Sequence, residues 1–238
     1  KKSKKSKLFT EIEIKEISRI KTGFNEFDRV LGGGLVHGSI ILLGGEPGIG
    51  KSTLVLQAAA QMSLSHNVIY ITAEESLEQV KVRWKRLNQR NSNLKVFAEN
   101  NLSIIIQEIK ENKPTIAIID SIQAINNSDL ESASGSVSQV RSCSSELQKF
   151  AKDYNISLLI IGHVTKDGTL AGPKTLEHLV DVVLNFEGDH IASHRLLRGI
   201  KNRFGATFEL GIFEMLENGL NEIKNPSSNF TNKENIAG

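Results

Sequence analysis

Short apolar runs alternate with amphipathic stretches through the first three quarters of the chain. Four runs have the length of single strands and are mostly apolar: Ser39–Leu43, Val68–Thr72, Thr115–Ile119 and Ser157–Gly162. Such runs are typical of strands in a parallel sheet whose two faces are both covered by helices. From residue 180 the pattern changes to consecutive strand-like runs, Val180–Phe186, Ser193–Ile200 and Thr207–Glu214. The pattern therefore predicts an α/β fold, with a mixed, mostly parallel sheet flanked by helices and with C-terminal antiparallel strands.

The stretches between these runs predict helices with one apolar face. We expect a short capped helix that ends at Leu31, before the glycines at 32–34, and further helices over Thr53–Met62 and from Asn101 to Lys110. Ser76 is placed to cap another helix, whose inward-facing residues are Leu77, Val80, Trp84 and Leu87. A last helix follows the polar loop 126–135 and has the inward-facing residues Val137, Val140, Leu147 and Phe150.

Composition divides the 238 residues into a body and two tails. Residues 1–18 begin with five lysines in the first seven positions and then alternate Glu and Ile over Glu11–Ile14. We expect this segment to be a basic tail or linker that leads into an edge element. Residues 19–225 are expected to form one domain, and residues 226–238, at the end of a stretch rich in Asn, Ser and Lys, are expected to be a linker.

The net charge of +2 comes from the N-terminal lysines. Without those five lysines, 24 basic and 27 acidic residues remain, which gives a net charge of −3. The body is therefore not a generally basic nucleic-acid binder, and contacts with DNA would have to come from local basic patches.

No apolar run approaches the ~20 residues that a membrane-spanning helix needs, and no signal-peptide pattern is present. We therefore expect a soluble, cytoplasmic protein that does not bind membranes. The single cysteine, Cys143, excludes an internal disulfide and a cysteine-based metal site within the chain.

The first apolar run leads into the motif Gly45-Glu46-Pro47-Gly48-Ile49-Gly50-Lys51-Ser52, which fits G-x-x-x-x-G-K-[ST] at every fixed position. Glycines in such a loop let successive backbone N–H groups turn inward and form a nest for anions. Lys51 can then reach the β- and γ-phosphates, and the Ser52 hydroxyl can ligate Mg²⁺. The helix that continues from Thr53 points its positive N-terminal end at the phosphates. The motif predicts a nucleoside triphosphate site over residues 45–53.

Two acidic positions at strand ends predict the rest of the site. Asp120 ends the apolar run Thr115–Ile119, where a carboxylate can hold the metal ion through its water shell. Glu74 and Glu75 follow the strand that ends at Thr72, and such a carboxylate can polarise the attacking water. One of the pair can instead stabilise the N-terminus of the next helix, and we assign the role of base to Glu74 because it is nearer the strand end.

Four basic residues and one histidine have more than one interpretation. Lys201 and Arg203 project to the same side of an extended strand, where they form either a solvated face or a pair that stabilises phosphate charge in a neighbouring subunit. His163 follows a core strand and either senses the γ-phosphate or bonds to backbone at the strand end. Arg83 and Arg86 are weak candidates for contacts with the base or with a neighbouring subunit.

Taken together, the chain resembles the RadA/Sms family of bacterial DNA repair ATPases, within the RecA superfamily. The resemblance covers about residues 12–226 and includes the phosphate loop and these further segments: Thr22-Gly23, Leu31–Gly34, Ala73–Ser76, Ile119–Gln123, Gly162–Lys166, Ala171–His178 and Lys201-Asn202-Arg203-Phe204-Gly205. The last segment is the signature of that family, whereas the phosphate loop is shared by many families.

The resemblance implies a RecA-like P-loop ATPase core that assembles as a hexameric ring on single-stranded DNA, with ATP and Mg²⁺ bound between subunits. It implies a DNA-dependent motor that processes branched recombination intermediates, with the RecA recombinase as a candidate partner. It makes Lys51, Glu74, Lys201 and Arg203 the expected catalytic residues, the last two acting on a neighbour. The loops 126–135 and 164–173 are expected to face DNA, and Lys166 and Lys174 to contact its phosphates.

Two features of the family have no counterpart in the sequence, namely an N-terminal four-cysteine zinc module and a C-terminal Lon-protease-like domain. We therefore expect this chain, which begins without methionine, to be the ATPase-domain portion of a longer protein. Two other functions stay open: an ATP-gated module that loads another helicase with little turnover, and a KaiC-like ATPase. A KaiC-like protein would share the Thr-Gly and Gly-Gly-Gly segments but would not be expected to carry Lys-Asn-Arg-Phe-Gly.

Overall fold

The structure is a computed structural model that describes residues 8, 10, 18–88, 93–163, 176–188 and 193–223. Its helices are α1 (Asn25–Val30), α2 (Lys51–Met62), α3 (Leu77–Arg86), α4 (Leu102–Asn112), the 3₁₀ helix η2 (Ile122–Ala124) and α5 (Val137–Tyr154). Its first six strands are β1 (Arg19–Ile20), β2 (Leu35–Val36), β3 (Ile40–Gly45), β4 (Val68–Thr72), β5 (Lys95–Ala98) and β6 (Ile116–Asp120). The remaining strands are β7 (Ser157–Ile161), β8 (Val182–Gly188), β9 (His194–Asn202), β10 (Leu210–Leu216) and β11 (Gly219–Glu222).

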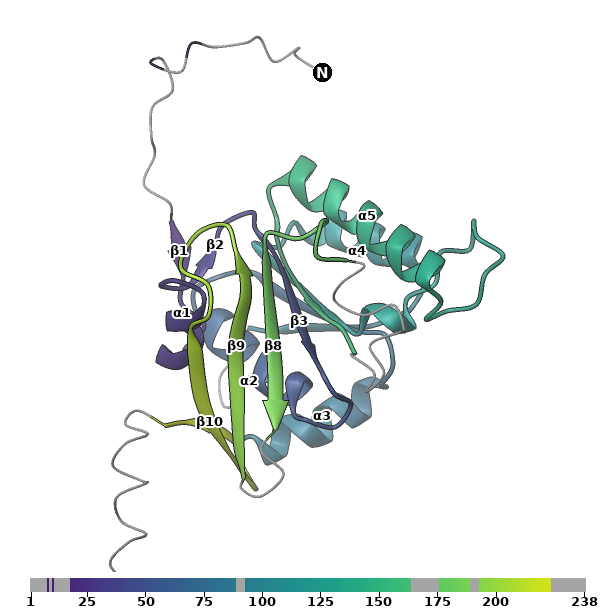
Figure 1. The fold of residues 1–238 in the computed structure, drawn as a ribbon. Coiled ribbons are helices and arrows are strands. Elements are labelled where there is room, and N and C mark those ends of the chain that lie inside the picture. The colour runs from purple at the N-terminus through teal and green to yellow at the C-terminus, as the bar shows by residue number, and fades with distance from the viewer. Residues whose placement is uncertain are drawn as a thin grey trace, which may run out of the picture.

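The strands β3 to β11 form one sheet in the order β11-β10-β9-β8-β3-β7-β6-β4-β5. From β8 to β5 each neighbouring pair is parallel, and β9, β10 and β11 continue from β8 as antiparallel strands. The predicted fold class, a mixed and mostly parallel sheet with C-terminal antiparallel strands, is confirmed (Figure 1).

Two apolar cores cover the two faces of this sheet. Because successive side chains of a strand point to opposite faces, Ile41 and Leu43 pack in one core and Ile40 and Leu42 in the other. The first core lies under α1, α2 and α3, and the second lies under α4 and α5. Figure 1 shows α4 and α5 together on the upper right and α2 and α3 below. Burial on both faces explains why the central strands are uninterrupted apolar runs.

Several local expectations are corrected. Leu77 and Val137 were expected to face inward, but they are 47% and 47% exposed, because the cores cover only the central part of α3 and α5. The N-cap of α1 is Phe24, which makes no side-chain capping bond, whereas Ser76 caps α3 with a capping box. The short elements β2, β5, η2 and β11 were not predicted, and β1 lies where an edge element was expected but pairs with β2 in a separate two-stranded sheet. The expected loop 164–173, with Lys166, and also Lys174 lie outside the described residues.

The β10–β11 hairpin is fixed to α2 by one side chain. Gln57 Nε2 donates to the carbonyl of Leu220 at 3.2 Å, and the N–H of Leu220 donates to Gln57 Oε1 at 2.9 Å. These two hydrogen bonds hold the antiparallel half of the sheet against the helix that follows the phosphate loop. Among the described residues, no helix has the length and apolar character needed to cross a membrane.

Candidate active site

The phosphate loop connects the end of β3 to the start of α2, as the strand–loop–helix context of the motif requires. Three of its glycines, Gly45, Gly48 and Gly50, have φ values of +153°, +77° and +110°. A Cβ at Gly45 would lie 2.4 Å from the carbonyl oxygen of Phe186, whereas no described atom lies within 4 Å of a Cβ at Gly48. The loop therefore keeps its inner surface as bare backbone, which is the form an anion-binding nest takes.

Lys51 is the buried cation of this loop, with only 3% of its surface exposed. Its Nζ donates to the carbonyl of Gly45 at 2.7 Å and to the carbonyl of Glu46 at 2.8 Å. Burial lowers the pKa of Lys51 to about 8, and the negative charges of Asp120, Glu74 and Glu46 only partly oppose that shift. An anion bound in the loop would give the Lys51 ammonium a direct partner of negative charge.

Asp120 ends β6 beside Thr72, the last residue of β4. It is 8% exposed, and the hydroxyl of Tyr70 donates a hydrogen bond to its Oδ2. Burial, and then the nearby Asp120 charge, raise the pKa of Tyr70, so that this hydroxyl stays protonated and keeps its role as a donor. Sequence reasoning missed Tyr70, because a buried tyrosine in a strand is usually a core residue.

The described residues contain no group of three or more His, Cys, Asp or Glu that could hold a metal ion. Mg²⁺ is commonly bound by one or two protein oxygens together with water and substrate phosphates. Ser52, in the first turn of α2, and Asp120 fit such a site.

Glu74 and Glu75 have separate partners. Glu74 accepts hydrogen bonds from Ser121 Oγ and from His163 Nε2, the latter at 3.3 Å, and remains 46% exposed. The hydrogen bond from His163 is the largest cause that lowers the pKa of Glu74, followed in the same direction by the bond from Ser121. Glu75 instead pairs with Arg83 of α3. Glu74 is thus the carboxylate whose charge acts on Lys51, whereas Glu75 is held by an ion pair with Arg83.

His163 links Glu74 to the end of β7. Its backbone carbonyl accepts a hydrogen bond from Gln123 Nε2 at 3.2 Å, and its Nδ1 is buried without a hydrogen-bond partner among the described atoms. His163 is the last described residue before 164–175. No sequence pattern signals the contact with Glu74, which lies 89 positions away along the chain.

Lys201 and Arg203 lie near the opposite end of the sheet from the phosphate loop of their own chain. Lys201 Nζ donates to the carbonyls of Glu177 and Val180, which precede β8. Arg203 forms an ion pair of 3.1 Å with Asp181, whose other carboxylate oxygen accepts a hydrogen bond from the N–H of Ile40. The other expected basic residues, Lys166 and Lys174, cannot be placed, since they lie outside the described ranges.

Comparison with known proteins gives the relationships of the chain. Residues 8–169 match the AAA domain family. The chain is 54% identical over 222 residues to the DNA repair protein RadA of Bacillus subtilis (strain 168), which corresponds to 93% of this chain and 48% of that protein. It is 50% identical over 229 residues to the DNA repair protein RadA of Streptococcus pneumoniae, which corresponds to 96% of this chain and 54% of that protein. The chain thus spans about half the length of the curated relatives that it matches.

Solved structures with the same fold include a KaiC-like protein from Pyrococcus horikoshii OT3, with a TM-score of 0.73 and 19% identity over 87% of this chain and 99% of that one. A second solved structure, of an ATPase domain, has a TM-score of 0.74 and 16% identity over 87% of this chain and 92% of that one. At these identities the similarity shows the fold alone.

The buried ammonium of Lys51 predicts a pH dependence of stability. The folded-state pKa of about 8 lies below the ordinary value of 10.5, so the unfolded chain binds more protons between these two pH values. The free energy of unfolding should therefore rise with pH between 8 and 10.5, by about 3 kcal/mol from this group. Urea unfolding of the wild type and of Lys51→Met at several pH values isolates the effect, because other titrating groups are shared. If the free energy of unfolding changes with pH in the same way for both proteins, Lys51 is not buried as a cation.

Proposed function

The chain belongs to the AAA domain family and is homologous to the RadA DNA repair proteins, and from this premise we propose that it is the ATP-hydrolysing motor of such a protein. In this proposal it acts on single-stranded and branched DNA and drives branch migration of recombination intermediates. The proposal is carried by the convergence of Lys51, Asp120 and Glu74 at the carboxyl ends of the parallel strands. These three groups match the three tasks of a phosphate-transfer site, namely phosphate binding, metal binding and positioning of the attacking water.

The substrate in this proposal is ATP, bound with its phosphates along the inner surface of residues 45–53. The ammonium of Lys51 and the N–H groups at the start of α2 would neutralise the phosphate charge. Ser52 and Asp120 would hold Mg²⁺, which would neutralise charge on the phosphate oxygens. Tyr70 keeps the Asp120 carboxylate in one orientation through its hydrogen bond.

Glu74 is the proposed base that orients the attacking water. Its lowered pKa keeps it ionised, and its 46% exposure leaves it open to solvent, unlike a fully buried structural carboxylate. Ser121 and His163 occupy one side of the carboxylate and fix its direction. His163 contacts Glu74, the proposed catalytic base, and the expected DNA-facing segment follows His163 directly in the sequence.

Lys201 and Arg203 are proposed to act on a nucleotide bound by a neighbouring subunit. Lys201 pairs with Val183 of β8, which in turn pairs with Leu42, so the backbone of Lys201 lies level with the amino-terminal half of β3. Gly45 is three residues farther along β3, about 10 Å away along the strand direction, and one more strand intervenes. Both side chains also point toward the amino end of β8. They are therefore badly placed to act on a nucleotide in the phosphate loop of their own chain. We propose a hexameric ring, in which they would lie at the phosphate loop of the neighbouring subunit.

The remaining parts of the proposal rest on the family. We propose that Lys166 and Lys174, with the loop 126–135, contact DNA phosphates, that the RecA recombinase is a partner, and that the protein acts in the cytoplasm. In the alternative function, an ATP-gated module that loads another helicase, the same residues would bind ATP, but the rate of ATP hydrolysis would be low.

The first test is ATP turnover with and without single-stranded DNA. Lys51→Ala should abolish hydrolysis, and Glu74→Gln should lower kcat by about 10²- to 10⁴-fold while nucleotide affinity changes little. The matched control is Glu75→Gln, which should lower kcat by less than about tenfold because Glu75 pairs with Arg83 rather than facing the phosphates. Unchanged hydrolysis in Lys51→Ala would refute the ATPase assignment. Wild-type turnover near zero, with ATP-dependent assembly, would instead favour the loading module.

The second test concerns action across a subunit boundary. Lys201→Ala and Arg203→Ala should each lower turnover by about 10³-fold, as the loss of an arginine finger does. Mixing either variant with Lys51→Ala should restore part of the activity, because some mixed interfaces combine an intact phosphate loop with intact basic residues. Arg198→Ala, on the same strand and in a surface ion pair of 3.6 Å with Glu187, is the matched control and should retain activity. Mixtures with no more activity than their components would contradict action in trans.

A further inference from the structure

One buried glutamine binds the loop 126–135 through its side chain. Gln139 lies in the first turn of α5 and has none of its surface exposed, although glutamine is mostly an exposed residue in proteins. The loop connects η2 to α5, and Figure 1 shows it projecting on the right of the molecule, beyond the N-terminal end of α5. The proposed ATPase chemistry makes no use of this glutamine.

The Gln139 amide makes hydrogen bonds to four residues of the loop. Its Oε1 accepts from the N–H of Asn127 at 2.9 Å, and its Nε2 donates to the carbonyls of Asn127 and Ser132 at 3.1 and 2.8 Å. The carbonyl of Leu130 and the side-chain oxygen of Asn126 lie 3.3 and 3.2 Å from the same nitrogen. Because this nitrogen has two hydrogens, the four acceptors share them. One side chain thus fixes backbone groups that are spread over most of the loop.

Asn127 holds the loop to α5 from within. It is buried, its Nδ2 donates to Glu146 Oε1 at 2.9 Å, and its Oδ1 accepts from the N–H of Asp129 at 3.1 Å. On the side of the ATP site, η2 follows Ser121, which donates a hydrogen bond to Glu74. The loop is therefore fixed at both ends, to α5 and to the residue that contacts the proposed catalytic base.

The charge of the loop makes its shape important for binding DNA. The ten residues 126–135 include Asp129 and Glu131 and contain no lysine or arginine. Contacts of this loop with DNA phosphates must therefore come from backbone N–H groups and from hydroxyl and amide side chains in fixed positions. A loop without a fixed shape would also let the two exposed carboxylates approach the phosphates, and like charges repel.

We propose that Gln139 is a positioning residue, which holds the loop 126–135 in its DNA-binding shape before DNA arrives. The choice of DNA as the ligand rests on the proposed function, whereas the hydrogen bonds of Gln139 belong to the chain itself. A loop that is ordered in advance loses less conformational entropy on binding, so loss of the amide should weaken DNA binding. Nucleotide affinity should change little, because the loop contributes no group to the phosphate site.

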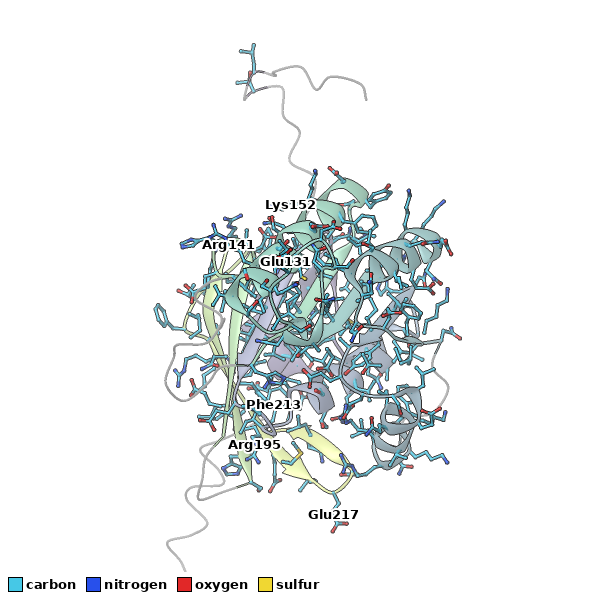
Figure 2. All side chains as sticks on the ribbon, turned by 90° about the vertical axis from the view of Figure 1, so that its right-hand side faces the viewer. Glu131, Arg141, Lys152, Arg195, Phe213 and Glu217 are labelled. Carbon is cyan, nitrogen blue, oxygen red and sulfur yellow. The ribbon has the colours of Figure 1, made fainter. Side chains whose placement is uncertain are left out.

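The first measurement is cleavage of the full chain by a protease that cuts after glutamate. Glu131 is exposed in the middle of the loop, and Figure 2 labels it. In Gln139→Met, which keeps the length of the side chain and removes the amide, cleavage after Glu131 should become about tenfold faster or more. Cleavage after Glu111 in α4 should stay unchanged. The matched control is Gln148→Met, on the same helix, whose amide donates to the carbonyl of Leu179 outside the loop.

The second measurement is binding of a fluorescent single-stranded oligonucleotide, followed by anisotropy with Mg²⁺ and a non-hydrolysable ATP analogue. Gln139→Met should raise the Kd for the oligonucleotide about tenfold or more, and Gln148→Met should bind as the wild type does. The salt dependence of Kd should keep its slope, because no cation is lost. Asn127→Ala loosens the same loop from another side and should shift cleavage and Kd in the same direction, which covers the case that Gln139→Met does not fold.

The outcomes separate this proposal from the proposed function. Equal cleavage after Glu131 in the wild type and in the folded variants would overturn the proposal, because the loop would then keep its shape without these amides. Faster cleavage with unchanged affinity for the oligonucleotide would overturn it as well, because the shape of the loop would then not matter for DNA. If the wild type binds no oligonucleotide, the DNA part of the proposed function is wrong, and the cleavage rates still decide whether Gln139 positions the loop.

Discussion

An ammonium group buried at the start of α2 is the constraint on which the site depends. Among the described residues, Lys51 is held by two backbone carbonyls and by no carboxylate in direct contact, and it lies at the positive end of a helix. Burying a charge without a paired ion costs free energy, and the pKa of Lys51 is lowered for this reason. A triphosphate relieves it, because it brings several negative charges to the place where both the ammonium and the helix end are positive.

The strands β8 and β9 hold the phosphate loop in this form. The carbonyl of Phe186 lies where a side chain at Gly45 would go, and Arg195 Nε donates to the carbonyl of Ile49 at 3.1 Å. Figure 2 shows Arg195 and Phe213 at the end of the molecule where Glu217 marks the β10–β11 hairpin. The strand β9 thus carries Arg195 at one end, against its own phosphate loop, and Lys201 near the other. One strand of nine residues connects a residue that supports the site in its own chain with a residue proposed to act on the next subunit.

The sequence predicted the elements that are defined by local patterns. The apolar runs located β3, β4, β6 and β7, because strands buried on both faces tolerate few polar residues. The loop motif located Lys51 between a strand and a helix. The strand β5 escaped prediction, because Lys95-Val96-Phe97-Ala98 has only four residues and lies at an edge of the sheet, where it is partly exposed. The contacts of Tyr70 with Asp120 and of His163 with Glu74 join residues 50 and 89 positions apart, and no local pattern encodes such pairs. The roles of the site residues remain predictions.

The central claim is that the loop at residues 45–53 is a triphosphate site whose binding energy depends on the buried ammonium. Titration calorimetry of the folded chain with Mg²⁺ and a non-hydrolysable ATP analogue tests it most directly. We predict saturable heat for the wild type and a loss of at least about 100-fold in affinity for Lys51→Ala, since a buried charge pair is worth about 3 kcal/mol or more. The absence of any heat of binding at millimolar nucleotide, in a chain shown to be folded, would contradict the account.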